Sequence, residues 1–166
     1  MNITLRPAIE SDLSLITEIY SDTSMSSYDD WKPGDVDPKS ELIEMMDYRW
    51  NIDVPQYLII EVDDEAVGFV IGTPREHHQF EIGYYVVSRM SGKGIATEAL
   101  KQFIAFAYDN GIHRCFCHID PQNIGSIRAA EKAGMNIEGT MRHSSQIHGE
   151  WADDAIYACI KGRYAI

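Results

Sequence analysis

The chain has 166 residues, enough for one domain with a sizeable hydrophobic core and too few for two full domains. Apolar residues make up 45% and charged residues 24%, so the chain as a whole is not expected to be disordered. The net charge of −12 disfavours general nucleic-acid binding, because an acidic surface repels phosphate backbones. No apolar run is long enough to span a membrane, no signal-peptide pattern opens the chain, and three cysteines are too few for a disulfide framework. We therefore expect a cytoplasmic protein without membrane or nucleic-acid partners.

The charge is distributed unevenly. Residues 1–88 hold 18 acidic and 5 basic residues, a net charge of −13, whereas residues 89–166 hold 8 acidic and 9 basic residues, a net charge of +1. The acidic residues are densest between Tyr28 and Glu65. The first half is therefore suited to meet a cation and the second an anion, although an acidic surface can equally serve solubility alone.

In chain order, the first predicted elements are a short strand and two amphipathic helices. Alternating residues predict a strand at 2–6, and Ser11 is expected to cap the first helix. The apolar face of this helix is expected to hold Leu13, Ile16, Ile19 and Tyr20. Residues 21–37 have the composition of a loop, and Pro38 is expected to begin a second helix that ends near Trp50. Its apolar stripe is expected to hold Leu42, Ile43, Met46 and Trp50.

The middle of the chain predicts a strand meander followed by a long helix. Strands are expected at 57–62, 66–72 and 80–87, the first two joined as a hairpin. Apolar residues then recur at helical spacing over Ile95–Asn110, and Gly111 is a suitable terminator.

The last third predicts a strand at 113–119, a short helix from Asn123 to about Gly134, and strands at 136–147 and 151–161. The pattern is that of a single domain of mixed α/β (α+β) class with a largely antiparallel sheet. This domain is expected to span 1–166, with an acidic half over about 1–80.

The most informative segment joins the last strand of the meander to the long helix. Gly92 and Gly94 can adopt positive φ and let a ligand approach the backbone. The first helical amides, from about Ile95, have no intrahelical acceptor, and such amides at the positive end of a helix dipole form an anion site. The segment therefore predicts a phosphate site, although a tight turn alone would also explain the glycines. It matches neither the P-loop nor the dinucleotide fingerprint. The side chains that add positive charge here are Arg89 and Lys93.

The same segment, Arg-Met-Ser-Gly-Lys-Gly-Ile-Ala over residues 89–96, resembles the acyl-CoA signature Arg/Gln-x-x-Gly-x-Gly/Ala of the GNAT acyltransferase superfamily. Further matching segments extend the resemblance over about Glu81–Ile160, in the order typical of the subgroup that includes ribosomal-protein N-terminal alanine acetyltransferases. They begin at Glu81, Thr97, Asp120, Glu131, Glu138 and Gly149. The resemblance implies the GNAT fold: a central mixed, largely antiparallel sheet with flanking helices, whose splayed middle strands hold acetyl-CoA. Residues 81–166 would then be the acyl-CoA-binding half.

The resemblance also implies roles for individual residues toward acetyl-CoA as the acyl donor. Val86 and Val87 would pair with the pantetheine through their backbone. Asn123 would hydrogen-bond the pantetheine, Ser126 would lie near the sulfur, and Lys132 would meet an adenosine phosphate. The pyrophosphate would lie on a segment that comprises Arg89, Gly92, Lys93, Gly94, Ile95, Ala96 and Thr97.

The implied chemistry requires a proton acceptor, because a primary amine with a pKa of about 10.4 is mostly protonated at neutral pH and cannot attack a thioester. Glu81 matches a strand position at which some family members place a general-base glutamate, or it orients water instead. Ser126 would steady the leaving thiolate through its hydroxyl, or serve only the helix start. A strand amide near Val86 or Val87 would stabilise the oxyanion.

Two positions depart from the family pattern. Ala130 stands where many members carry a general-acid tyrosine, and Ser145 stands where the alanine-acetylating subgroup can carry a glutamate base. The departures favour proton transfer through water. No metal site is predicted, because Cys115 and Cys117 share one strand face while His118 points away from them. Either an acceptor pocket or ordinary core packing would explain Tyr28, Trp31, Tyr48 and Trp50.

These features predict an acetyl-CoA-dependent N-acetyltransferase that moves an acetyl group to a primary amine by direct transfer in a ternary complex. The acidic first half favours a cationic acceptor, such as a peptide α-amine, a polyamine or a small cationic amine. Two alternatives remain: a non-catalytic acyl-CoA-binding sensor module and an O-acyltransferase on the same fold. The chain is expected to act as a monomer or a homodimer.

Overall fold

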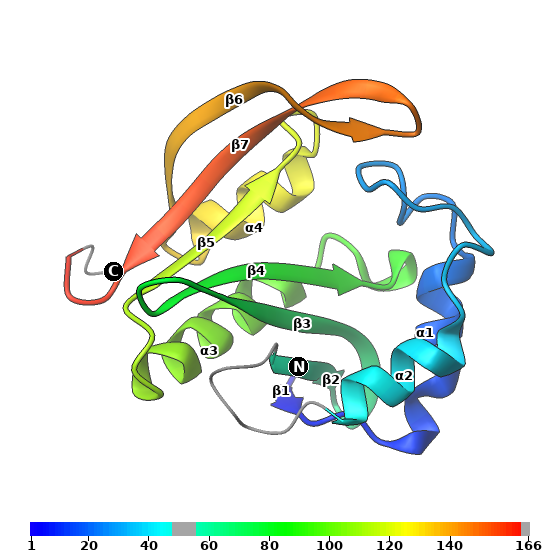
Figure 1. The fold of residues 1–166 in the computed structure, drawn as a ribbon. Coiled ribbons are helices and arrows are strands. Elements are labelled where there is room, and N and C mark those ends of the chain that lie inside the picture. The colour runs from blue at the N-terminus through cyan, green and yellow to red at the C-terminus, as the bar shows by residue number, and fades with distance from the viewer. Residues whose placement is uncertain (48–55, 164–166) are drawn as a thin grey trace.

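The computed structural model describes residues 1–47 and 56–163. These residues form a seven-stranded mixed sheet with helices on both faces (Figure 1). The strands are β1 Ile3–Arg6, β2 Gln56–Val62, β3 Glu65–Arg75, β4 Gln79–Val86, β5 Arg114–Ile119, β6 Asn136–Ile147 and β7 Glu150–Ile160. The helices are α1 Leu13–Ser21, α2 Pro38–Asp47, α3 Ile95–Asp109 and α4 Ile124–Lys132, with 3₁₀ turns η1 Glu10–Asp12 and η2 Ser88–Met90.

The centre of the sheet is where its strands part. The strand order is β1-β2-β3-β4-β5-β7-β6, and each neighbouring pair is antiparallel except β4 and β5. These two are parallel and pair only from Gln79 opposite Arg114 to Glu81 opposite Phe116. Beyond this point they diverge (Figure 1), which leaves their facing backbone groups without a strand partner. The expected fold class and the splayed middle strands are confirmed.

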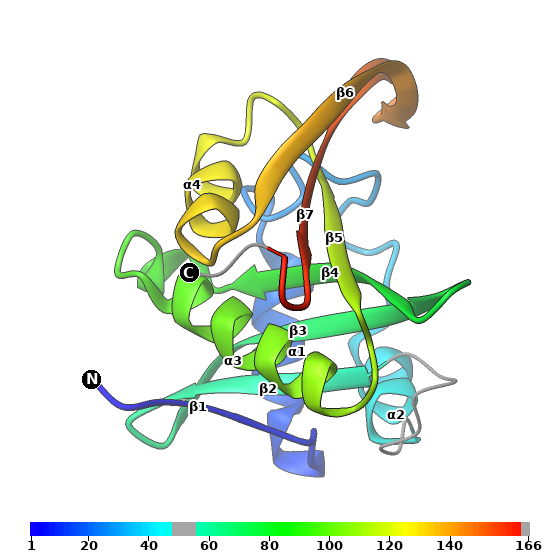
Figure 2. The same ribbon diagram turned by 90° about the vertical axis from the view of Figure 1, so that its left-hand side faces the viewer.

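Helices α1 and α2 pack on one face of the sheet, and α3 and α4 pack on the other (Figure 2). The alternation of side chains along each strand divides the buried residues between these two layers. The α1/α2 layer includes Ile16, Ile19, Met45, Ile59 and Phe69. The α3/α4 layer includes Phe80, Leu100, Phe103, Cys115 and Cys117.

The start of α1 differs from the expectation. Ser11 lies inside η1 and does not cap the helix, and Asp12 occupies the N-cap position. Arg6 donates two 2.8 Å hydrogen bonds to the buried Asp12 carboxylate, and this contact holds the chain in the 3₁₀ turn. The helix is therefore rotated, so that Leu13 is 38% exposed and Leu15 packs in the core instead.

The apolar stripe of α2 is also displaced from the expected one. Leu42 is buried as expected, but Ile43 and Met46 are exposed and Met45 is buried. Leu42 and Met45 are three residues apart and share the helix face that packs on the sheet. The expected position of Trp50 in this stripe lies outside the described residues.

The remaining predicted elements are confirmed, with ends that differ by three residues or fewer. Within residues 1–47 and 56–163, no helix combines the length and apolarity required to cross a membrane. Cys115, Cys117 and Cys159 are free and buried.

Candidate active site

A cavity of about 590 Å³ occupies the V between β4 and β5 and continues over the N-terminal end of α3. Its wall combines the loop after α1, the second half of β4, the turn before α3, the end of β5 and the start of α4. The cavity therefore joins segments from both halves of the chain at the point where the sheet opens.

The turn before α3 presents backbone amides to the cavity. Gly92 and Gly94 have φ of +76° and +80°, and a Cβ at either position would meet nothing within 4 Å. Glycine is therefore required there by backbone conformation and not by lack of space. The first helical hydrogen bond runs from the Glu98 amide to the Gly94 carbonyl, so the three preceding amides have no intrahelical acceptor. These three, which line the cavity, belong to Ile95, Ala96 and Thr97.

The first turn of α4 forms a second side of the cavity. Asn123 caps this helix, as expected, by accepting a 3.2 Å hydrogen bond from the Ser126 amide. Tyr84 donates a 3.0 Å hydrogen bond to the Ser126 carbonyl, and burial raises the pKa of Tyr84, which keeps it a neutral donor. These contacts fix Asn123 and Ser126 against β4, and both line the cavity together with Lys132.

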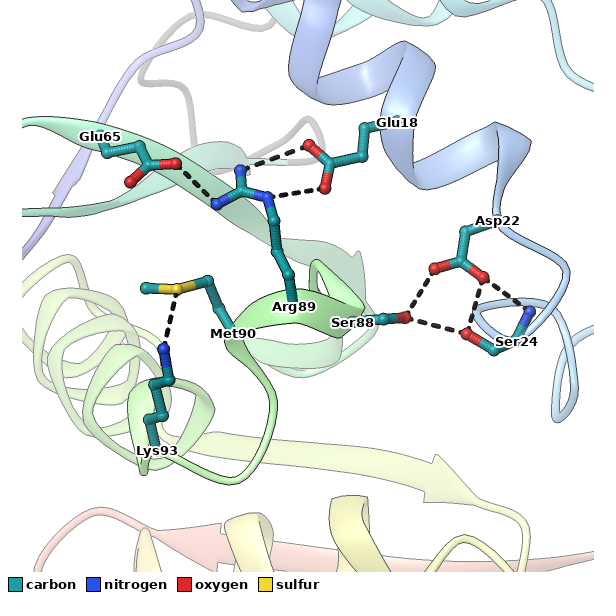
Figure 3. A network of polar contacts seen from close by, with 8 residues as sticks. All are labelled: Glu18, Asp22, Ser24, Glu65, Ser88, Arg89, Met90 and Lys93. Atoms are coloured by element: carbon teal, nitrogen blue, oxygen red, sulfur yellow. Dashed lines mark hydrogen bonds and ion pairs between the residues drawn. The ribbon is translucent and has the colours of Figure 1, made fainter.

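The Arg89 side chain does not line the cavity and points toward Glu18 of α1 and Glu65 of β3 (Figure 3). Its guanidinium donates to Glu18 at 2.8 Å and to Glu65 at 2.6 Å, and these hydrogen bonds raise its pKa. Lys93 likewise does not line the cavity, and its Nζ lies 3.3 Å from the Met90 sulfur. Neither Arg89 nor Lys93 therefore adds its charge to the cavity wall in this structure, where the expected phosphate site is lined by the backbone amides of the turn.

The same region ties the turn to the loop after α1. Ser88 donates a 2.6 Å hydrogen bond to Asp22, which also accepts from the Ser24 amide at 2.8 Å (Figure 3). The hydrogen bond from Ser88 lowers the pKa of Asp22. These contacts connect the two sides of the cavity at its mouth.

The end of β4 differs from the expectation at one residue. Val86 lines the cavity, but Val87 is buried and its amide donates a 2.9 Å hydrogen bond to the Val67 carbonyl. The Val87 amide is therefore already used within the sheet, and Val86 is the residue of the pair that is exposed to a ligand.

Glu81 is held beside the cavity and does not line it. Arg75 donates a 2.8 Å hydrogen bond from Nε to Oε2 of Glu81, and the other carboxylate oxygen, Oε1, lies 4.0 Å from Nδ1 of His118. His118 does line the cavity. The sequence predicted Glu81 as the base and considered His118 only in excluding a metal site. The signal for His118 was strand alternation, which places its side chain on the face opposite Cys115 and Cys117.

A carboxylate faces the cavity from the loop after α1. Asp29 lines the cavity and accepts a 2.8 Å hydrogen bond from the Tyr85 hydroxyl. Burial raises the pKa of Asp29, and the Tyr85 hydrogen bond opposes that rise. Tyr28 also lines the cavity, whereas Trp31 packs edge-on against Tyr20 with ring centroids 5.0 Å apart. The expectations for Tyr48 and Trp50 lie outside the described residues.

The β6–β7 hairpin closes over this loop (Figure 1). The His148 amide donates a 2.9 Å hydrogen bond to Asp30, and His148 Nε2 lies 3.1 Å from the Ser26 carbonyl. The hairpin therefore holds the acidic loop in place beside the cavity. Among residues 1–47 and 56–163, no cluster of three or more His, Cys, Asp or Glu residues is arranged to hold a metal ion.

Comparison with known proteins agrees with this architecture. Residues 2–136 match the family described as the acetyltransferase (GNAT) domain. This chain belongs to the GNAT acetyltransferase family. The protein is therefore an acyltransferase.

Three relatives illustrate the range of the family. The probable N-acetyltransferase YjcK of Bacillus subtilis is 38% identical over 80 residues, which cover 48% of this chain and 44% of that protein. The spermidine N(1)-acetyltransferase of Escherichia coli K12 is 24% identical over 162 residues, or 96% of this chain and 86% of that protein. The solved ribosomal-protein-alanine N-acetyltransferase of Brucella melitensis has a TM-score of 0.80 and 26% identity, and covers 95% of this chain and 99% of that chain. This last similarity agrees with the subgroup resemblance of the sequence.

Proposed function

We propose that this GNAT acetyltransferase moves the acetyl group of acetyl-CoA to a positively charged primary amine, by direct transfer in a ternary complex. The observation that carries the proposal is one cavity whose wall holds both backbone amides and a carboxylate. The amides suit the phosphates of an anionic donor, and the carboxylate suits a cationic acceptor. The donor and the acceptor would then meet at the V between β4 and β5.

The donor end fits acetyl-CoA through its backbone. Gly92 and Gly94 leave room above the turn, and the amides of Ile95–Thr97 would hold the pyrophosphate. The Val86 backbone would pair with the pantetheine, Asn123 and Ser126 would contact it from α4, and Lys132 would meet an adenosine phosphate. The Ser126 hydroxyl would donate a hydrogen bond to the leaving sulfur.

The acceptor end supports a cationic amine. Asp29 supplies a carboxylate on the cavity wall, within the acidic half of the chain. The relative that acetylates spermidine acts on a polyamine, as its name states, and this supports the same chemical class here. Residues 1–166 would act as one N-acetyltransferase domain, because strands from both halves form one sheet. Free, buried cysteines suit a cytoplasmic location.

The proposal is tested by release of free thiol from acetyl-CoA across a panel of amines: spermidine, aminoglycosides, amino acids and N-terminal peptides. Saturable release with a cationic primary amine, and a product that resists hydroxylamine as an amide does, is the expected result. A hydroxylamine-sensitive ester product would indicate O-acylation. Acetyl-CoA that raises the melting temperature without thiol release from any acceptor would indicate a sensor module.

A further inference from the structure

His118 lines the cavity next to the expected base, Glu81. Although Glu81 was the expected base, its Oε2 is bonded to Arg75, and Glu81 does not line the cavity. Its free oxygen, Oε1, faces Nδ1 of His118 at 4.0 Å. His118 lines the cavity, and its side chain is 35% exposed. The Glu81 carboxylate therefore lies next to the His118 imidazole, and His118, not Glu81, belongs to the cavity wall.

The position of His118 in the sheet places it on the acceptor side. It follows Phe116, the last residue of β5 that pairs with β4, by two positions, so it lies just inside the opening of the V. Cys117 and Ile119 on either side of it are buried in the α3/α4 layer. His118 must therefore face the opposite layer, which is the face that carries Tyr85 and Asp29.

We propose that His118 is the general base of the proposed acetyl transfer and that Glu81 is its positioning residue. Nδ1–H of the imidazole would point to Glu81, which leaves the lone pair of Nε2 for the cavity. This inference rests on the proposed function, because a base has a role here only if an amine is acetylated.

The step balances as follows. Neutral His118 takes one proton from the ammonium group of the acceptor at Nε2, and the freed lone pair forms the C–N bond to the thioester carbonyl carbon. The C–S bond then breaks, and its electron pair leaves on sulfur. The nitrogen loses its second proton to that sulfur, through the Ser126 hydroxyl or water, which yields the amide and free CoA thiol. The imidazolium finally releases its proton to solvent.

The charged surroundings of the imidazole are well defined. Glu81 on β4 faces it, and Arg75 on β3 lies behind Glu81. On β5 itself the Phe116 ring lies 5.8 Å from the imidazole, centroid to centroid. The Arg114 guanidinium lies 5.4 Å from the centroid of the Phe116 ring and forms an ion pair with Glu138 of β6. From β7 the facing residue is the apolar Ile156. Glu81 is therefore the carboxylate that faces Nδ1 and can orient the imidazole.

The test compares His118→Gln with His113→Gln, a matched variant of an exposed histidine that precedes the same strand and does not line the cavity. With the best acceptor from the amine panel, His118→Gln is expected to lower kcat about 100-fold or more and to remove the acidic limb of the pH profile. The dissociation constant for acetyl-CoA should stay within about twofold. His113→Gln should match wild type. Free imidazole should restore part of the activity of His118→Ala.

Glu81→Gln gives the readout that a merely structural role would not move. It is expected to lower kcat about tenfold while KM for the amine and the dissociation constant for acetyl-CoA stay within about twofold, because the imidazole loses the carboxylate that orients it. Wild-type turnover with full activity in His118→Gln, or an unchanged kcat in Glu81→Gln, would overturn the inference while leaving the proposed function intact. Wild type that binds acetyl-CoA and releases no thiol with any amine would overturn both.

Discussion

Under the proposed function, two regions of the cavity wall would recognise their ligands in different ways: a donor end at the turn before α3 and an acceptor end beside Asp29. At the donor end, Gly92 and Gly94 hold positive φ, and the amides at the start of α3 face the cavity. At the acceptor end, Asp29 and His118 present side chains from segments about 90 residues apart in the sequence. The turn before α3 is therefore a local backbone site, to which α4 and its N-cap would add Asn123, Ser126 and Lys132, whereas the acceptor end would be assembled by tertiary structure from side chains alone.

This difference explains why the donor end can be predicted from the sequence more readily than the acceptor end. A backbone site needs glycines at fixed spacing before a helix, and that spacing is visible in the signature. A side-chain site needs the loop after α1, β5 and the β6–β7 hairpin to meet, and no local pattern records that meeting. The following variants separate the two modes of recognition.

The largest effect is expected from Gly94→Val at the donor end. A β-branched residue is strained at φ +80°, so the turn should leave its conformation and the affinity for acetyl-CoA should fall about 10- to 100-fold. Gly111→Val is the matched control, since Gly111 has φ +86°, equally open space and no place in the cavity wall. Gly111→Val should lose about as much stability as Gly94→Val but should keep its affinity for acetyl-CoA, as measured by calorimetry. Equal affinities of the two variants would refute a backbone-based donor site.

Asp29→Asn is expected to raise KM for a cationic amine about tenfold and to leave acetyl-CoA binding unchanged. Asp35→Asn removes the same charge from the same loop outside the cavity wall and should leave KM unchanged. Equal KM values in both variants would show that only the overall acidity of the loop matters.

The raised pKa of Asp29 also predicts how the stability of the protein depends on pH. Because burial raises its pKa in the folded state, ionised Asp29 costs stability above that raised pKa. The cost shrinks as the pH falls through the raised pKa, and it is gone below about 3.9, the ordinary aspartate value. Asp29→Asn should therefore keep or raise the melting temperature at pH 7 and lose this advantage toward pH 4. A lower melting temperature at pH 7 would contradict this.

Asn123 separates the capping role from the donor role. Asn123→Ala removes the hydrogen bond to the Ser126 amide and is expected to cost about 1 kcal/mol of unfolding free energy. Asn123→Asp keeps the cap and should preserve stability, but it loses the amide donor and should weaken acetyl-CoA binding. If Asn123→Asp bound acetyl-CoA as wild type does, the side chain would serve the helix alone.

The smallest effect is expected at Arg89. Its side chain pairs with Glu18 and Glu65 at the surface, so Arg89→Ala should change acetyl-CoA affinity less than about twofold. Lys132→Ala should weaken affinity about threefold or more at low salt, and less at high salt, because Lys132 lines the cavity. A larger loss of acetyl-CoA affinity in Arg89→Ala than in Lys132→Ala would support the role that the signature suggested for the Arg89 side chain.

The sequence predicted the strands, α3, α4 and the donor turn, because each depends on local periodicity, glycines or a cap. It misplaced the start of α1 because the Arg6–Asp12 contact is a side-chain pairing that competes with the Ser11 cap. The motif gives the positions of Arg89 and Val87, but it records neither the ion pairs of Arg89 with acidic residues nor the hydrogen bond of the Val87 amide within the sheet. The sequence overlooked Asp29 and His118 because their meeting at one cavity depends on the splayed sheet.

The most direct test of the account measures thiol release from acetyl-CoA with spermidine for wild type, Gly94→Val and Asp29→Asn, at varied concentrations of both substrates. The account predicts saturable release in wild type, loss of acetyl-CoA affinity in Gly94→Val, and loss of amine affinity alone in Asp29→Asn. A wild type that binds acetyl-CoA but releases no thiol, or variants that affect both substrates alike, would contradict a cavity with separate donor and acceptor ends.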